Sequence, residues 1–106
     1  MTTDLNRVAW MQVWKLLPEE RRETRQVEIR DRDIIERLLA AVASAQRSDY
    51  YVEDFGAPRY FVRLFGEEAV LLDGLEIQPE YAYVRDEWKF TPDSEAWKVL
   101  EQVAAA

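Results

Sequence analysis

The chain of 106 residues has no cysteine and no histidine, and it has only three glycines and four prolines. Without imidazole or thiolate it lacks the commonest general base, a strong side-chain nucleophile and the ligands of nearly every zinc, copper or iron–sulfur site. The sequence contains neither a Walker loop nor a dinucleotide-binding GxGxxG loop. We therefore expect no cofactor, no metal ion and no enzymatic activity.

Basic residues are also outnumbered, since 14 lysines and arginines face 21 aspartates and glutamates, which gives a net charge of −7. This excess of acids opposes docking on phosphate backbones or anionic lipid. The longest strongly apolar stretch, residues 38–43, is much shorter than a membrane span, and residues 1–7 show no signal peptide. We predict a protein partner, no nucleic acid and no membrane insertion by this segment. The expected compartment is the cytoplasm as written, or an extracytoplasmic one if an N-terminal signal was removed.

Residues 1–106 are predicted to form a single domain, because 48% of them are hydrophobic and the length suits one core. Residues 8–17 are rich in bulky and β-branched types, which favours a strand. A helix is the alternative, because four bulky residues of this stretch also fall at helical spacing: Trp10, Val13, Trp14 and Leu17. A second strand is predicted over residues 24–30, where apolar and polar residues alternate.

Helical spacing is clearest in the next stretch of the chain, at Ile34, Ile35, Leu38, Leu39, Val42 and Ala45. Either Asp31 or Asp33 can cap this helix, and Asp33 with Glu36 forms an acidic variant of the capping box. Capping and the helix dipole account for these three acids without a bound cation. The helix is predicted to end near Ser48, with Ser44, Gln46 and Arg47 on its polar face.

The second half of the chain reads as short strands and a final helix. The predicted strands cover residues 59–65, 69–72, 81–85 and 88–90, with turns at 66–68 and 86–87. Asp73-Gly74 is a turn or bulge signal, so residues 75–77 are either a continuation of the preceding strand or a new short one. Thr91-Pro92 opens the last helix, whose apolar stripe is Ala96, Trp97, Leu100 and Val103. We predict an α+β fold: an antiparallel meandering sheet with two amphipathic helices packed on one face, in the order β-β-α-β-β-β-β-α.

Three segments carry a resemblance to a known family: Val27-Glu28-Ile29-Arg30-Asp31 running into residues 34–42, Gly56-Ala57-Pro58-Arg59-Tyr60, and Phe90-Thr91-Pro92. From Val8 onward the layout resembles the small YhfM-like domains, found mainly as the mature part of lipoproteins in Gram-positive bacteria. The resemblance implies a compact extracytoplasmic module without enzymatic activity. The chain departs from that pattern because it has no lipid-anchoring cysteine.

The aromatic residues, four Trp, five Tyr and four Phe, are the remaining signal. We predict that Trp10, Trp14, Trp97 and either Phe61 or Phe65 belong to the core. A second group lies near a helix exit and a hairpin, where rings stand beside acids and can anchor a basic partner. The predicted partner-binding residues are Tyr50, Tyr51, Asp54, Asp86, Glu87 and Trp88. The alternative interpretation is that they only cover the edge of the sheet.

The function predicted from these features is a non-catalytic interaction module whose acidic surface meets a basic partner, either as the soluble part of an envelope lipoprotein or as an intracellular inhibitor or immunity-type protein. The alternative is a small-ligand or carbohydrate-active protein that uses aromatic faces and two carboxylates. The candidate acids are Glu67, Glu68, Asp73, Glu76, Asp86 and Glu87. A sheet edge near Ala82 and Val84 is predicted to accept a partner strand or a second copy of the chain.

Overall fold

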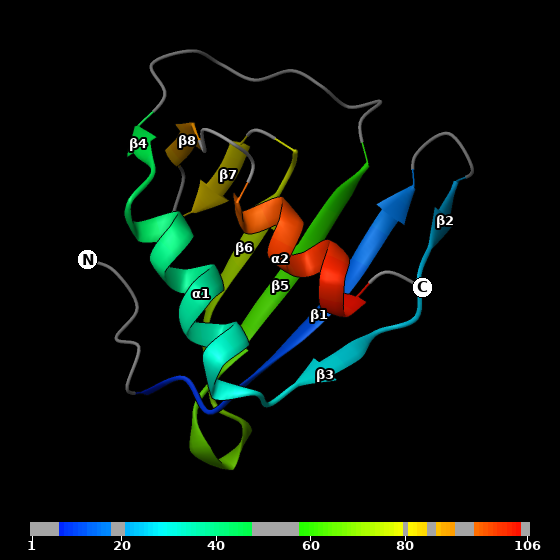
Figure 1. Ribbon diagram of the computed structural model, residues 1–106. Coiled ribbons are helices and arrows are strands. Elements are labelled where there is room, and N and C mark those ends of the chain that lie inside the picture. Colours follow the sequence, from blue (N-terminus) through cyan, green and yellow to red (C-terminus); the bar gives the residue numbers. More distant parts are fainter. Residues whose placement is uncertain are drawn as a thin grey trace.

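The computed structural model describes residues 7–17, 21–47, 58–79, 81–84, 87–90 and 95–104. One antiparallel sheet forms the first layer, and both helices lie against the same face of it (Figure 1). The helices are α1 (Arg32–Ala43) and α2 (Glu95–Ala104), and the short 3-10 turn η3 covers Glu67–Ala69. The strands are β1 (Trp10–Leu17), β2 (Arg22–Glu23), β3 (Val27–Ile29), β4 (Gln46–Arg47), β5 (Arg59–Phe65), β6 (Leu71–Ile77), β7 (Tyr81–Val84) and β8 (Glu87–Phe90).

The strand order across the sheet is β2-β1-β5-β6-β7-β8-β4, and β3 also pairs with β1. All pairings are antiparallel, and β1 to β5 is a long one, from Trp10 opposite Phe65 to Leu16 opposite Arg59. The α+β prediction is confirmed. Its order β-β-α-β-β-β-β-α describes the chain when β2 and β3 count as one interrupted strand and the two-residue β4 is set aside. Residues 10–17 form a strand and not a helix.

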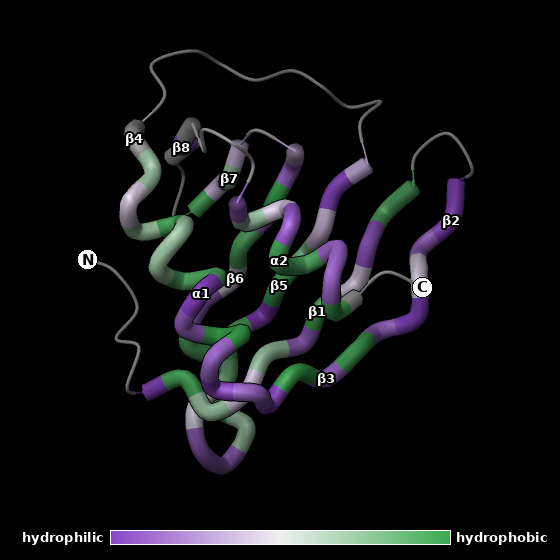
Figure 2. The backbone as a smooth tube through the Cα atoms, in the orientation of Figure 1, coloured by the Kyte–Doolittle hydropathy of each residue, from purple (hydrophilic) through white to green (hydrophobic). Residues whose placement is uncertain are grey.

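The alternation of buried and accessible residues along β1 and β5 explains why these strands form a sheet with one buried face. In β1 the odd-numbered Met11 and Val13 are fully buried, and in β5 the even-numbered Tyr60, Val62 and Leu64 are buried. The register places Met11 opposite Leu64, so the buried residues share the face beneath the helices. The same alternation of hydrophobic and hydrophilic residues along the strands can be seen in Figure 2.

Helix α1 forms where the sequence predicts it, with Asp31 as the N-cap. The Asp31 carboxylate accepts hydrogen bonds from the backbone N–H groups of Asp33 and Ile34. Glu36 pairs with Arg32 one turn earlier at 3.2 Å, so the predicted capping box between Asp33 and Glu36 is not what closes this end. The apolar stripe Ile35, Leu38, Leu39 and Val42 is buried against the sheet and α2.

One predicted boundary was wrong, and the alternative left open at Asp73-Gly74 is decided. Helix α1 ends at Ala43 with Ser44 as its C-cap, and not near Ser48, because Gln46 and Arg47 pair with β8 and leave the helical path. Asp73-Gly74 does not turn the chain but lies inside β6, so residues 75–77 continue the same strand.

The sheet edge predicted near Ala82 and Val84 is not an edge, because β7 is paired on both sides, with β6 and with β8. The backbone groups of β7 are therefore already used by its two neighbours. Strand β3 pairs only with β1 among the described residues, which makes it a described edge.

Lys15 of β1, a charged residue within a largely apolar strand, attaches helix α2 to the sheet. Lys15 lies on the helix-covered face of β1, and its Nζ is 2.7 Å from Oε1 of Glu101 on α2. The ammonium also lies 5.2 Å from the ring centroid of Tyr60 and 5.0 Å from that of Trp97, and these two rings contact each other at 4.9 Å. A cation over aromatic faces and beside a carboxylate is stabilised by both, so this cluster fixes where α2 rests.

Tyr60 is fully buried in this cluster. Burial first, and then the negative charge of Glu101, raise the pKa of Tyr60 well above its ordinary value of 10.0. The unfolded chain therefore loses this proton at lower pH than the folded chain does. The stability contributed by neutral Tyr60 is complete below the unfolded pKa and is lost as the pH rises through the folded pKa.

We expect the variant Tyr60→Phe to lose less unfolding free energy than the wild type between about pH 9 and about pH 11. Urea unfolding across this range measures the difference. Absorbance titration of the wild type should show one tyrosine that ionises only on unfolding, and this signal should be missing in the variant. An identical pH dependence of the two proteins would contradict the assignment.

Candidate functional site: the open face of the sheet

The second face of the sheet carries a group of aromatic side chains that no described helix covers (Figure 1). In β1 and β5 the residues of this face alternate with the buried ones, and strand register places them opposite one another. We call this surface the open face and define it by Trp10, Trp14, Phe61, Arg63, Phe65 and Leu71. Its four rings are neither fully buried nor fully exposed, whereas Arg63 and Leu71 are exposed.

The first row of the open face runs from Arg30, directly after β3, through Trp10 of β1 and Phe65 of β5 to Leu71 of β6. Trp10 and Phe65 are paired across β1 and β5 and stack with centroids 4.3 Å apart and planes inclined by 12°. Cζ of Arg30 lies 4.9 Å from the Trp10 centroid. Strands β3 and β5 flank β1 on opposite sides, so Arg30 and Phe65 approach opposite faces of the Trp10 indole. The indole therefore lies between them with its edge directed away from the sheet.

A β-bulge brings Leu71 into this row. The register of β5 and β6 shifts between Leu64 and Phe65, so Phe65 is paired with Leu71 while Leu64 is paired with Asp73. Leu72 is the extra residue, and it packs against the core. Bulges commonly re-aim a side chain, and here the bulge leaves Leu71 on the open face with 59% of its surface exposed.

A further row contains Trp14, Phe61 and Glu76. Trp14 stacks on Phe61 with centroids 5.5 Å apart, and Cζ of Arg63 lies 4.8 Å from the Trp14 centroid. Glu76 is opposite Phe61 and accepts a hydrogen bond of 2.8 Å from Nη1 of Arg59. The Arg59 and Glu76 side chains are only 11% and 17% exposed, so this ion pair is a largely buried part of the sheet.

Between the two aromatic rows lies a polar row made of Glu28, Gln12, Arg63 and Gly74. Glu28 is bonded to Arg30 at 3.3 Å. Arg63, by contrast, forms no ion pair with any residue of the described segments and contacts the Trp14 ring. Gly74 of β6 stands opposite Arg63 without a side chain, and the Arg63 guanidinium lies on the other side of β5, over Trp14 of β1.

The prediction that Trp10, Trp14 and Phe61 or Phe65 belong to the core was wrong. None of them is among the buried residues, because the helices cover the alternate residues of the same strands. Trp97 does pack against the core from α2. The missed signal is a shared pattern in two strands, Trp10-x-Gln12-x-Trp14 and Phe61-x-Arg63-x-Phe65. A polar residue at the centre of each triplet is typical of a face that meets water.

The partner-binding residues predicted from the sequence are mostly not placed by the structure. Tyr50, Tyr51, Asp54 and Asp86 lie outside the described residues. Glu87 and Trp88 belong to β8, where their backbones pair with Val84 and Tyr83. That set of residues stays a prediction. The residues that sequence analysis did not select, above all Arg63 and Leu71, lie on the open face instead.

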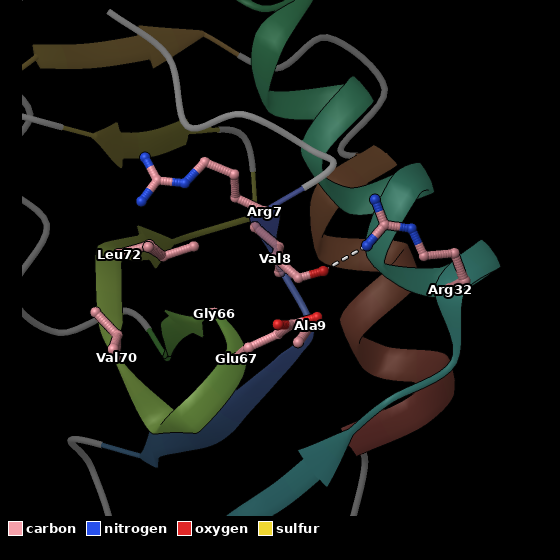
Figure 3. A pocket seen from close by; sticks show the side chains of 8 residues that line it. All are labelled: Arg7, Val8, Ala9, Arg32, Gly66, Glu67, Val70 and Leu72. Atoms are coloured by element: carbon pink, nitrogen blue, oxygen red, sulfur yellow. Dashed lines mark hydrogen bonds between the residues drawn. The ribbon is translucent and has the colours of Figure 1, made fainter.

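A pocket of about 640 Å³ lies between the lead-in to β1, the start of α1 and the turn before β6. Figure 3 shows that Arg7 and Arg32 lie on opposite sides of it and that the Arg32 guanidinium is directed at the carbonyl oxygen of Val8. Small-ligand sites gather a few polar groups that converge on one point, and these two do not converge. Among the described residues of the lining, Glu67 is the one carboxylate, so the described lining does not supply the two facing acids of a glycosidase.

Neither metal ligands nor membrane spans emerge from the described part of the chain. No three acidic side chains gather there into a group able to hold an ion. The helices there are too short or too polar to cross a bilayer. The acids Asp31, Asp33 and Glu36 act in capping and pairing at the start of α1.

Comparison with protein-family models, with curated proteins and with solved structures finds no match for this chain. The resemblance to YhfM-like domains therefore stays a prediction from sequence. Any function proposed for the protein has to be argued from the geometry of the open face itself.

Arg59 and Arg63 differ in a way that unfolding measurements can resolve. Arg59→Gln leaves Glu76 largely buried without its main cation and should lower the unfolding free energy by about 3 kcal/mol. Arg63→Gln removes an exposed cation–π contact and should cost less than about 1 kcal/mol. Urea unfolding of both variants tests this, and the double variant Arg59→Gln/Glu76→Gln should recover part of the loss. If both single variants lowered the unfolding free energy by the same amount, the assignment of Arg59 to a buried ion pair and of Arg63 to an exposed contact would be contradicted.

Proposed function

We propose that this protein is a non-catalytic protein-interaction module that binds its partner on the open face. The single observation that carries the proposal is an aromatic surface with an exposed arginine and an exposed leucine on a sheet face without a described cover. Aromatic residues and arginine are the types enriched at the energetic centres of protein interfaces. Leu71, 59% exposed, and its neighbour Val70, 55% exposed, extend the apolar area at its end.

The ring geometry favours a protein over a carbohydrate. Sugar rings stack on flat, free aromatic faces, whereas Trp10 has one face against Phe65 and the other beneath Arg30. Trp14 contacts Phe61 and Arg63, which both belong to β5. These residues offer a ligand stacked ring pairs and the ends of guanidinium groups. Such a ridged surface suits the side chains of another protein.

The proposal suits either cellular setting predicted for the chain. An envelope module of the YhfM-like kind and an intracellular inhibitor would each act through a surface and not through catalysis. The hypothesis of an acidic surface around Tyr50, Tyr51, Asp54, Asp86, Glu87 and Trp88 is a separate prediction, and four of these residues lie outside the described ranges.

Site-specific photocrosslinking in cells of the native host tests the proposal. A benzophenone amino acid in place of Leu71 should give a discrete adduct with another protein. The same amino acid in place of Gln102, exposed on α2, provides the matched control and should give none. The purified partner should then bind the purified chain about tenfold or more weakly when Trp14→Ala is introduced. Circular dichroism confirms that the variant is folded. No adduct at position 71, or equal adducts at both positions, would overturn the proposal.

A further inference from the structure

The charge at the centre of the open face indicates what kind of protein segment fits it. Two of the described carboxylates of this face are held by arginines, Glu28 by Arg30 and Glu76 by Arg59, and the third, Glu23, is opposite Leu16, two rows away from the Arg63 row. Arg63 remains, exposed and without an ion pair among the described residues. A chain with a net charge of −7 thus presents a local positive centre on this face. Its partner there should supply a carboxylate.

Stacking prepares Arg63 for this role. The guanidinium lies over the Trp14 ring at 4.8 Å, which restrains its plane. Its N–H groups lie in that plane and can donate two parallel hydrogen bonds to one carboxylate.

The rows of the face set the spacing of the partner. Trp10 with Phe65 and Trp14 with Phe61 flank the Arg63 row on either side. Adjacent rows are two residues apart along a strand, which is about 7 Å. In an extended peptide, side chains two positions apart have the same separation and point the same way. An apolar residue, an acid and a second apolar residue at positions 1, 3 and 5 therefore match the three rows.

Building on the proposed function, we infer that the open face binds an extended, acidic segment of the partner with the pattern apolar-x-acid-x-apolar, with Arg63 as the residue that selects the acid. This sign is opposite to the basic partner expected from net charge. A second copy bound face to face is disfavoured, because the two-fold contact would bring the central arginines together. Nucleic acid is disfavoured because the net charge of the chain is negative.

The probes are three synthetic peptides that differ only at the central position: Val-Thr-Asp-Thr-Val, the same with Asn, and the same with Lys. Titration into the isotopically labelled full chain, monitored by NMR, should shift the Arg63 side-chain and Trp10 and Trp14 indole signals with the Asp peptide. The Asn peptide should bind about tenfold more weakly, because it loses a charge-assisted hydrogen bond. Arg63→Gln should abolish the preference for Asp, and Arg63→Glu should reverse it toward Lys. Retained shifts of residues remote from the face confirm that both variants are folded.

The outcomes separate this inference from the proposed function. An Asp peptide that binds no better than the Lys peptide overturns the inference, as does a crosslinked partner whose contact segment is basic, while the crosslink itself would still support an interaction module. Binding of an oligouridylate in place of the peptides would overturn both. A preference for Asp that survives Arg63→Gln would show that another residue selects the acid and would also overturn the inference.

Discussion

The antiparallel register between β1 and β5 is the constraint on which the other features depend. It places Met11 opposite Leu64 on one face and Trp10 opposite Phe65 on the other. A shift by one residue would exchange the two faces, since side chains alternate along a strand. The buried face then attracts the amphipathic helices, and the aromatic residues are left on the side that the helices cannot reach. Core and candidate site are thus two consequences of one pairing.

Positively charged side chains play different roles on the two faces of the sheet. Beneath α2, Lys15 is enclosed by Tyr60, Trp97 and Glu101, and its charge serves to seat the helix. On the open face, guanidinium groups lie over indoles, where water can reach them. The same cation–π chemistry stabilises packing in the first case and, on our proposal, leaves donors available for a partner in the second.

Much of the fold could be predicted from local pattern. The stripe from Ile35 to Val42 and the acid at Asp31 identify α1, and alternation identifies β5. Errors arose where a local signal competed with pairing between distant segments. Gln46 and Arg47 read as the end of a helix but pair with β8, and Asp73-Gly74 reads as a turn but continues a strand paired with β5. Aromatic residues were assigned to the core because size and hydrophobicity favour burial, although a two-layer fold can bury only one face.

By itself the sequence determined that the chain has no imidazole or thiol group, that residues 34–42 are helical and that residues 59–65 are extended, because these features depend on residue type and nearest neighbours. Only the tertiary structure decided which strands are adjacent, which face the helices cover, and that Trp14 and Arg63 meet. Those choices arise from contacts between residues far apart in the chain, where the free energy of burial outweighs local preference.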